Sequence, residues 1–307
     1  MAKFLVTGGY GFIGSHLVDA LLKRGDQVRI LDNLSTGHLR NVVGEHEFIR
    51  GDVADKNIVE QAMDGVQGCF HLAAVASVAL SNKDWTGTHL TNQTGTINIF
   101  DAARKNLTRG VVYASSAAVY GDSNKTPLSE SEPIKPLTAY GADKAGSELH
   151  ARVATLSHGV STVGLRFFNV FGPRQDPSSP YSGVISIFID RTLKGQKITI
   201  FGDGEQTRDF IYVSDVVAHM LAAMELKPAE PQLFNVCTGR SISLNKLLEN
   251  IFSASNRKVA VCNAPPRLGD IRHSNGSPTL ATKTMGVKAE VALLEGLTAL
   301  LQDDLKR

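Results

Sequence analysis

The chain has 307 residues, of which 42% are hydrophobic and 20% are charged, and its formal net charge is +2. These values are typical of an ordinary globular protein with one large α/β domain or two domains that share a cleft. No block of like charges indicates a nucleic-acid partner, and no apolar run is long enough to span a membrane, so we expect neither.

The cysteines give a further bound on the class of protein. Cys69, Cys237 and Cys262 lie far apart in the sequence, without metal-ligand spacing, and their odd number argues against a disulfide framework. We therefore expect no metal site and a location in the reducing cytoplasm. The first residues run directly into an apolar segment and lack the layout of a signal peptide.

Strands and helices alternate through the first half of the chain. Residues 3–7 are a short apolar run that predicts a buried strand, residues 12–23 carry apolar side chains at helical spacing, and residues 27–31 predict a second strand. The same reading predicts strands at 47–50, 68–72, 110–114 and 161–167, and helices at 55–63, 90–104 and 139–156. This alternation predicts an α/β fold with a doubly wound parallel (Rossmann) sheet.

The composition and the length of the predicted elements change after residue 168. The stretch 172–183 is rich in Pro, Ser and Gly, which indicates an ordered loop or a crossover between domains. Shorter elements follow, with helices expected at 184–193, 216–224, 244–252 and 290–301 and strands at 198–201 and 210–213. We expect a smaller α/β domain for substrate, which divides the chain into 1–168 plus about 210–236 and 169–209 plus about 237–307.

A glycine-rich loop joins the first strand to the first helix. Gly8 allows the tight turn, Gly11 lets the backbone approach a pyrophosphate, and Gly14 lets the helix pack closely on the strand. Asp32 ends the second strand, where its carboxylate can accept both hydroxyl groups of an adenosine ribose and would repel a 2′-phosphate. Because the loop, the helix and the acid occur together, the sequence predicts a site for NAD.

A serine, a tyrosine and a lysine form a second pattern. Tyr140 and Lys144 are four residues apart, so they share one face of a helix, and the ammonium group favours the phenolate form of the tyrosine. The phenolate can then act as a base near neutral pH. Ser116 follows a neighbouring strand, at the sheet edge where parallel sheets bind ligands. A solvated helix face is the alternative reading of the Tyr–Lys pair.

At this point the sequence resembles an extended short-chain dehydrogenase/reductase of the nucleotide-sugar epimerase and dehydratase group, and specifically the UDP-hexose 4-epimerases. The resemblance rests on the stretches TGGYGFIGSHL, LDNLSTG, GDVAD, HLAA, SSAAVYG, YGADK, RFFNVFGPRQ, FGDGEQTRDFIYVSDV and PPRLGDIRHS. It implies that the larger domain binds NAD and that the smaller one binds a UDP-sugar. Members of the family commonly form homodimers through two long helices, here the helices expected at 90–104 and 139–156.

The resemblance also implies roles for individual residues. It makes Tyr140 the base, Lys144 its partner and Ser116 the hydrogen-bonding partner of the reacting hydroxyl. The residues implied to bind the cofactor, besides Tyr140 and Lys144, are Gly8, Gly11, Phe12, Ile13, Gly14, Asp32, Asn33, Asp52, Val53, Leu72, Ala73, Ala74 and Asn92. The residues implied to bind the substrate are Ser116, Asn169, Val184, Phe201, Arg208, Arg267, Asp270 and Ser274.

Some of these positions have a plainer alternative. Arg208 can form an ion pair with Asp203 or Asp209 in place of a contact with the substrate diphosphate, and Arg272 is a second candidate for that contact. We interpret His71 and His273 as packing or loop residues. No titratable pattern in the sequence gives them a catalytic role.

The choice of reaction depends on two alanines. Dehydratases of the family carry an Asp and a Glu before their Val-Tyr-Gly, and UDP-glucuronate decarboxylases carry a Glu there, whereas this chain has Ala117 and Ala118. Because a methyl group transfers no proton, the resemblance favours C4 epimerisation through a transient 4-keto sugar. The alternatives are a UDP-glucuronate 4-epimerase or decarboxylase and, in another class, a cofactor-sensing binding protein.

A serine bears on the choice of sugar. In the 4-epimerases that the chain resembles, the residue at the position of Ser274 bounds the pocket beside the C2 substituent of the sugar. A tyrosine there excludes an N-acetyl group and a small residue admits it, so Ser274 predicts that UDP-GlcNAc and UDP-GalNAc fit alongside UDP-glucose and UDP-galactose. The plainer interpretation of Ser274 is a loop hydroxyl.

Overall fold

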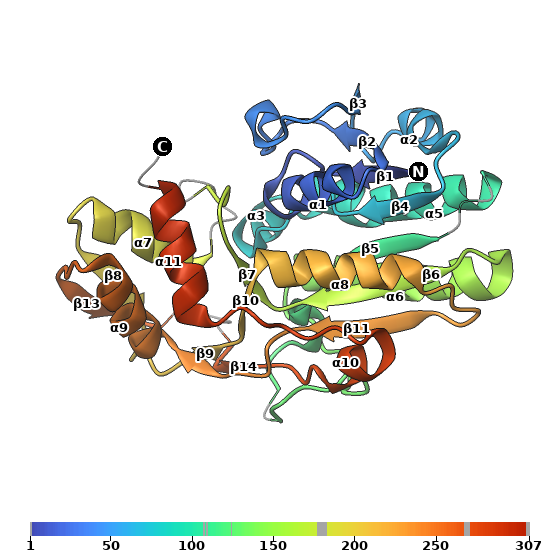
Figure 1. Cartoon of the computed structure of the whole chain (residues 1–307). Helices are drawn as coiled ribbons and strands as arrows, with labels where there is room; N and C mark the ends of the chain where they lie inside the picture. The colour runs from blue at the N-terminus through green and yellow to red at the C-terminus, as the bar shows by residue number, and fades with distance from the viewer. Residues whose placement is uncertain are drawn as a thin grey trace.

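The computed structural model describes residues 2–106, 108, 110–123, 125–176, 183–266 and 271–304. Figure 1 shows a larger unit built around a broad sheet and a smaller unit beside it, to which the chain crosses after the sixth strand. No helix in these described ranges is both long enough and apolar enough to cross a membrane.

The large sheet has seven strands, and every neighbouring pair in it is parallel. In spatial order they are β11 (Gln232–Val236), β6 (Thr162–Phe167), β5 (Val111–Ser116), β4 (Gly68–His71), β1 (Lys3–Thr7), β2 (Gln27–Asp32) and β3 (Glu47–Arg50). The chain steps outward from β1 to β3 and then returns to β4 on the other side of β1. This reversal opens a crevice at the carboxyl ends of β1 and β4, where doubly wound sheets bind ligands.

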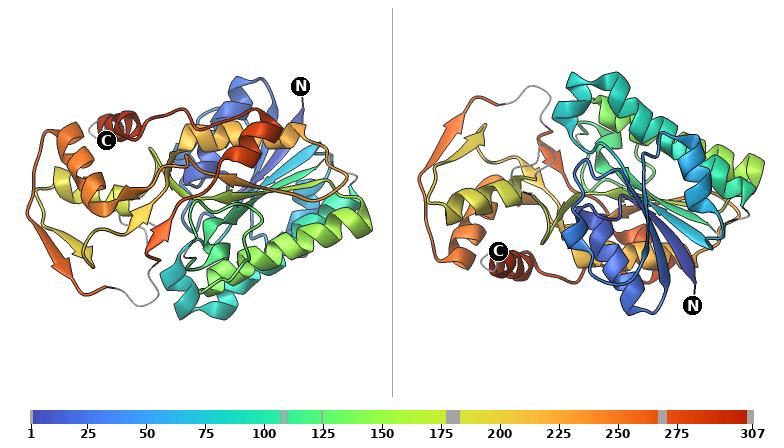
Figure 2. Two further views of the ribbon diagram at one scale, coloured as in Figure 1. Left: turned by 90° about the horizontal axis from the view of Figure 1, so that it is seen from below. Right: turned by 90° about the horizontal axis from the view of Figure 1, so that it is seen from above.

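Helices cover both faces of this sheet (Figure 2). One layer contains α1 (Phe12–Lys23), α8 (Val213–Glu225) and α10 (Thr279–Met285), and the other contains α2 (Lys56–Met63), α5 (Gly95–Lys105) and α6 (Ala139–His158). Phe4 and Val6 of β1 pack into the first layer and Leu5 into the second, because successive side chains of a strand point to opposite faces. All three are at most 1% exposed. Each such burial contributes roughly 1.5–3 kcal/mol before the entropy cost of ordering the chain.

The smaller unit has its own apolar core, formed between α7 (Val184–Leu193), α9 (Leu244–Ser255) and α11 (Leu293–Asp304). Two strands pair in parallel there, β8 (Ile198–Phe201) and β13 (Val261–Ala264). A three-stranded sheet follows the order β12 (Ile242–Ser243), β9 (Thr207–Arg208) and β14 (His273–Ser274). A parallel pair, β7 (Asn169–Phe171) and β10 (Phe210–Tyr212), lies where the chain passes between the units.

The structure confirms the expected fold class, and several elements have the bounds that the sequence predicts, among them α1, α7, β1, β3 and β8. Other elements differ. The helix expected at 90–104 has a wide turn, η2 (Leu90–Thr94), before α5, and α8 begins three residues earlier than expected, at Val213. Ser214 and Asp215 explain the earlier start, since such residues favour the first turn of a helix more than a strand.

Several elements were not predicted at all. They are α3 (Val78–Lys83), α4 (Trp85–His89), α10, β7, β9, β11, β12, β13 and β14, together with the short turns η1 (Leu39–Asn41) and η3 (Ala117–Tyr120). The expected division into domains places α10 in the smaller unit, but α10 packs against α8 and β11 of the larger one, with Ala281 in the larger core. Elsewhere the division stays a proposal.

Candidate active site

A cavity of about 440 Å³ lies at the carboxyl ends of β1, β2, β4, β5 and β6. Of the predicted site residues, those that line it are Gly8, Gly11, Phe12, Ile13, Gly14, Asp32, Asn33, Asp52, Val53, Leu72, Ala73, Ala74, Ser116, Tyr140, Lys144 and Asn169. These residues come from segments as far apart in the sequence as Gly8 and Asn169. The crevice of the sheet therefore gathers most of the predicted cofactor set and all of the predicted catalytic set.

The glycine loop is packed too closely for side chains. Gly8 has a φ of +68°, and a Cβ atom there would lie 2.9 Å from the backbone nitrogen of Ala73, across the point where the strand order reverses. A Cβ atom on Gly14 would collide with the carbonyl oxygen of Gly8. Helix α1 begins after Gly11 without any side-chain cap, so N–H groups of its first turn are left to a ligand.

The carboxylate of Asp32 is held by the backbone around it. Its two oxygens accept hydrogen bonds from the backbone N–H groups of Tyr10, at 3.0 Å, and Leu34, at 2.8 Å. Burial raises the pKa of Asp32, and these two bonds counteract part of that shift. Beside it, the Asn33 amide donates to the carboxylate of Asp52 at 2.8 Å. Three of the residues predicted to bind the cofactor thus lie together at the ends of β2 and β3.

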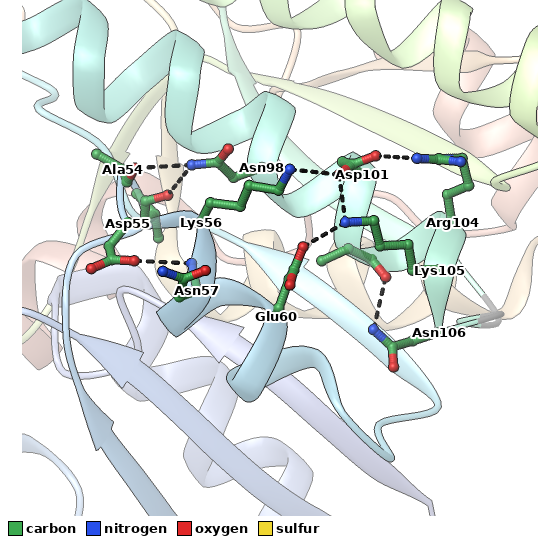
Figure 3. Close-up of polar contacts among 12 residues, drawn as sticks. Ala54, Asp55, Lys56, Asn57, Glu60, Asn98, Asp101, Arg104, Lys105 and Asn106 are labelled. Carbon is green, nitrogen blue, oxygen red and sulfur yellow. Dashed lines mark hydrogen bonds and ion pairs between the residues drawn. The ribbon is translucent and has the colours of Figure 1, made fainter.

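The wall of the cavity at Val53 is fixed from behind by the outer helices. Asn98 of α5 donates from its side-chain nitrogen to the carbonyl oxygens of Val53 and Ala54, each at 3.0 Å. Figure 3 shows Asn98 in place, with an ion pair between Lys105 of α5 and Glu60 of α2 nearby. Exposed ion pairs add little to stability on their own, so Asn98 is the contact that positions Val53.

His71 is part of a buried chain of hydrogen bonds under the segment 72–73. The hydroxyl oxygen of Thr7 accepts from the backbone N–H groups of residues 72 and 73, both at 3.1 Å, so its own proton is directed to Nδ1 of His71 at 2.8 Å. The other ring nitrogen, Nε2, then donates to the Thr96 hydroxyl at 3.1 Å, which in turn donates to the carbonyl oxygen of Asn92. Burial lowers the pKa of His71 to about 3, so the ring is neutral.

Asn92 acts on the cavity through a neighbour. Its side-chain oxygen accepts from the backbone N–H of Val75 at 2.8 Å, and its nitrogen donates to the carbonyl oxygen of the same residue at 3.1 Å. Asn92 is 1% exposed and is absent from the described lining, whereas Val75 belongs to it. The structure therefore places Asn92 behind the lining, where it holds the backbone of residue 75.

The three predicted catalytic residues converge at the end of β5. A hydrogen bond with Ser116 lowers the pKa of Tyr140, but burial has the larger effect and the net shift is upward. Lys144 Nζ lies 5.8 Å from the centre of the Tyr140 ring and donates to the carbonyl oxygen of Ala114 at 2.7 Å. Burial lowers the pKa of Lys144 to about 8. The structure therefore places the Tyr140 phenol beside a buried ammonium group and a serine hydroxyl, the arrangement that the sequence predicts for these three residues.

Asn169 and Arg208, two of the residues predicted to bind the substrate, are connected through the backbone of Asp209. Asn169 lines the cavity, and its backbone N–H donates to the carbonyl oxygen of Asp209, the neighbour of Arg208, at 2.9 Å. The Arg208 guanidinium donates to the carbonyl oxygen of Thr207 at 2.8 Å. Arg272, the second phosphate candidate, forms a bidentate ion pair with Asp203, at 2.7 and 2.8 Å.

The remaining predicted substrate residues are spread over the smaller unit. Ser274 pairs with Arg208 across β14 and β9 and is 8% exposed, while His273 contacts the hydroxyl of Thr207 through Nδ1. Val184, Phe201, Arg208 and Ser274 are absent from the described lining of the cavity. Arg267 and Asp270 lie outside the described residues. The described part of the chain holds no group of three His, Cys, Asp or Glu side chains suited to a metal ion.

The lining also contains residues that the sequence analysis did not single out. They include residues 35–38, Val75, Thr91 and residues 174–176. The first group begins three residues after Asp32. Gly37 packs against the Asp32 carboxylate, since a Cβ atom there would lie 3.0 Å from one of its oxygens. A Ser-Thr-Gly turn after the acid could have indicated this group. Two residues of the last group, Arg174 and Gln175, belong to the motif GPRQ. The motif indicates the family but does not indicate that these side chains line the cavity.

The geometry fits a dinucleotide. An uncapped helix start faces the cavity for a diphosphate, the close-packed glycines leave room for it, and a buried carboxylate at the end of β2 suits a ribose diol. The wall of small residues at 73–74 continues this cradle towards Ser116 and Tyr140.

Comparisons with known proteins agree with this geometry. Residues 4–237 match the NAD dependent epimerase/dehydratase family. The chain is 40% identical over 295 residues to a putative UDP-glucose 4-epimerase of Methanocaldococcus jannaschii, covering 95% of each protein. It is also 33% identical over 275 residues to a UDP-N-acetyl-alpha-D-glucosaminuronate decarboxylase of Bacillus cytotoxicus, covering 86% of this chain and 83% of the relative.

Solved structures are similar over nearly the whole chain. The UDP-glucose 4-epimerase of Thermotoga maritima with UDP-glucose has a TM-score of 0.95 at 35% identity, covering 99% of both chains. The UDP-N-acetylglucosamine 4-epimerase of Methanobrevibacter ruminantium has a TM-score of 0.95 at 36% identity, covering 99% of this chain and 98% of the other. The Thermus thermophilus UDP-glucose 4-epimerase complex with NAD has a TM-score of 0.90 at 37% identity, covering 98% of both.

The family match covers most of the chain, and the relatives span nearly its full length. The solved structures share its fold, and the Thermus thermophilus enzyme is a complex with NAD, the cofactor that the glycine loop predicts. The chain is therefore an enzyme of the NAD dependent epimerase/dehydratase family, within its UDP-hexose 4-epimerase branch of extended short-chain dehydrogenases, and its cofactor is NAD.

Proposed function

We propose that this enzyme inverts the configuration at C4 of UDP-hexoses, and that it accepts both the UDP-glucose/UDP-galactose and the UDP-GlcNAc/UDP-GalNAc pairs. The observation that carries the proposal is the group formed by Ser116, Tyr140 and Lys144 at one end of the cavity. Directly after Ser116 the chain turns through η3, which begins with two alanines where an acid would be needed for water loss.

In the proposed reaction Tyr140 takes the proton of the C4 hydroxyl, and Ser116 orients that hydroxyl through its own. The bound NAD supplies a hydride acceptor at C4 and then the donor of the same hydride. Lys144 stabilises the phenolate of Tyr140 by its charge. Asn169 and Arg208 would hold the diphosphate while the 4-keto sugar turns its opposite face to the cofactor, and Tyr140 would then give its proton back. No net oxidation results.

Decarboxylation of a UDP-glucuronate is the main competing reaction, because named decarboxylases are among the relatives. The Ala117–Ala118 pair speaks against it. A cofactor-sensing protein without catalysis is disfavoured by the complete serine, tyrosine and lysine set. We also propose a cytoplasmic location, supported by three free cysteines, and a use in supplying sugars for surface polysaccharides.

Proton NMR tests the reaction directly. We expect UDP-glucose and UDP-GlcNAc, each incubated with the enzyme and a little NAD, to develop the anomeric signals of UDP-galactose and UDP-GalNAc. Tyr140→Phe, which keeps the buried ring, should slow both conversions by roughly 10²- to 10⁴-fold. If no C4 epimer appears from either sugar while UDP-glucuronate is consumed, the proposal is wrong and the competing reaction is right.

A homodimer is also proposed, formed through an apolar surface on α5 and α6. Leu149, Val153 and Leu156 share one side of α6 and are 62%, 49% and 45% exposed, and Ile97 of α5 is 37% exposed. An apolar surface of this kind is usually covered by a partner. Val153→Glu should convert a dimer into a 33.0 kDa monomer in light scattering, whereas Val43→Glu, at a more exposed site outside α5 and α6 (92%), should leave the dimer intact.

A further inference from the structure

Residues 172–176 form a strap that follows β7 and lies against α1, the helix that begins at the glycine loop. We call α1 the cofactor helix. Three successive strap residues meet three side chains of α1. Gly172 lies beside the Phe12 ring, the carbonyl oxygen of Pro173 lies 3.0 Å from Nε2 of His16, and Arg174 donates to Asp19 at 2.6 Å. Positions 12, 16 and 19 are on one face of a helix. The strap therefore follows α1 away from the glycine loop.

Arg174 of the strap lines the cavity and has an unused hydrogen-bond donor. Its Nη2 bonds to Asp19, but its Nη1 is buried and has no hydrogen-bond partner among the described residues. Arg174 lines the same cavity as Gly11, Phe12 and Ile13 at the start of α1. Its φ is +69°, a conformation that costs free energy for a residue with a side chain.

A buried guanidinium nitrogen without a partner is costly, and the cost is removed when an anion accepts its hydrogen bond. The anion that belongs next to the uncapped start of α1 is the diphosphate of the dinucleotide. The substrate also carries a diphosphate, but Arg174 is tied to the cofactor helix and not to β9, which carries Arg208. The attachment to Asp19 favours the cofactor.

We propose that Arg174 binds the cofactor diphosphate through Nη1, with Asp19 holding its guanidinium in position. In this arrangement Arg174 is a binding residue and Asp19 a positioning residue. The strap then links cofactor retention to β7, which directly precedes it and whose first residue, Asn169, lines the cavity. The proposal rests on the NAD cofactor of the family and is independent of which sugar is the substrate.

Cofactor binding can be measured without turnover. Isothermal titration of the cofactor-stripped protein with NAD should show Arg174→Gln to bind roughly 10- to 100-fold more weakly, the loss expected for one charge-assisted hydrogen bond. The affinity of Arg174→Gln for ADP-ribose, which keeps the diphosphate but has no nicotinamide, should fall by the same factor. Its affinity for adenosine, which has no diphosphate, should fall little. Arg257→Gln, which removes an exposed arginine whose Nη1 bonds to the carbonyl oxygen of Leu193, controls for the change in net charge.

Asp19 provides the second arm of the experiment. Asp19→Asn keeps the guanidinium but weakens its anchor, so we expect a smaller loss of NAD affinity than in Arg174→Gln. In the double variant the Asp19 change should have no further effect, because Asp19 acts only through Arg174. Additive losses would contradict a positioning role.

Titration with UDP separates the two diphosphates. UDP binding should change less than twofold in Arg174→Gln. If UDP affinity falls while NAD affinity is retained, Arg174 serves the substrate and the proposal is wrong. It is equally wrong if neither affinity changes in a variant whose circular dichroism and Tm match the wild type. Neither result would bear on whether the enzyme is an epimerase.

Discussion

Lys144 and Ala114 are joined by a hydrogen bond from the ammonium Nζ to the carbonyl oxygen, at 2.7 Å. Because Ala114 lies two residues before Ser116, this bond ties α6, which carries Tyr140, to the strand end that carries the serine. The same burial that makes the bond strong lowers the pKa of Lys144 to about 8. The lysine is therefore held charged at neutral pH against a desolvation cost.

The first prediction concerns the free-energy cost of burying the charged form of Lys144. In the unfolded chain Lys144 keeps its proton up to its ordinary pKa of 10.5, while the folded protein releases it near 8. Between these values the unfolded state binds more protons, so the free energy of unfolding contributed by this group rises with pH. Lys144→Met should remove this rise, and urea unfolding from below pH 8 to above pH 10 measures the difference. A variant with the same pH dependence as the wild type would contradict the assignment.

Lys144→Met should also lower the turnover of the enzyme without lowering its stability below pH 8. Turnover should fall by roughly 10²-fold or more, because the phenolate of Tyr140 loses its cation. Below pH 8 the variant should be as stable as the wild type or more stable, since no charge is buried. Marked instability of the variant below pH 8 would mean that the bond to Ala114 outweighs the desolvation cost.

The second prediction concerns His71. Its pKa is lowered from 6.5 to about 3 by burial, so in this window the unfolded chain takes up a proton that the folded protein does not. The folded state therefore loses stability as the pH falls from 6.5 towards 3. His71→Gln, which can still bond to Thr7 and Thr96, should show a shallower acid limb in unfolding followed by circular dichroism. The exposed His158→Gln should follow the wild type.

Much of the site could be predicted from the sequence because its chemistry is local. The glycines, Asp32 and the Tyr140–Lys144 pair lie at fixed spacings beside strand ends, so an alternating α/β pattern is enough to bring them to one edge of the sheet. The structure gathers them there. The conformation of a tight turn and the spacing of residues on one helix face depend on residues that are close in the sequence, so both can be predicted from it.

What the sequence did not predict depends on distant partners. Strand β11 is five residues long and exists because it pairs with β6, some 70 positions earlier. The hydrogen bonds of Asn98 to Val53 and Ala54 join a helix to a loop, so the sequence gives this amide no special role. Asn92 is implied to bind the cofactor, but its bonds to Val75 depend on a loop 17 residues away. The position of the Arg174 side chain similarly depends on its hydrogen bond to Asp19, 155 residues away in the sequence.

The third prediction concerns a buried ion pair behind Ser116. Arg166 bonds to both carboxylate oxygens of Glu148, at 2.8 and 2.7 Å, and the hydroxyl of Ser115 donates to the same carboxylate at 2.6 Å. Both charged side chains are about 5% exposed. Glu148→Gln leaves the guanidinium buried without a counter-charge, so we expect a loss of about 3–5 kcal/mol in the free energy of unfolding.

A second variant distinguishes the pair from its packing. Arg166→Met with Glu148→Leu replaces both charges by apolar groups, and urea unfolding should show that most of the lost stability returns. If the double variant is as unstable as Glu148→Gln, the bonds to Ser115 and Tyr120 carry the stability and the ion pair does not.

The last prediction concerns the choice of sugar. Ser274 lies directly across from Arg208 in the pairing of β14 with β9, and it is 8% exposed, so a larger side chain there must take space from its surroundings. If this space receives the C2 substituent, Ser274→Tyr should abolish conversion of UDP-GlcNAc while UDP-glucose is still epimerised. Ser274→Ala, which keeps the space and removes the hydroxyl, should retain both conversions. Loss of both activities in Ser274→Ala, with the fold intact, would show that the hydroxyl itself is required and that steric room is not what Ser274 provides. Loss of UDP-glucose conversion alone in Ser274→Tyr would contradict the assignment of the pocket.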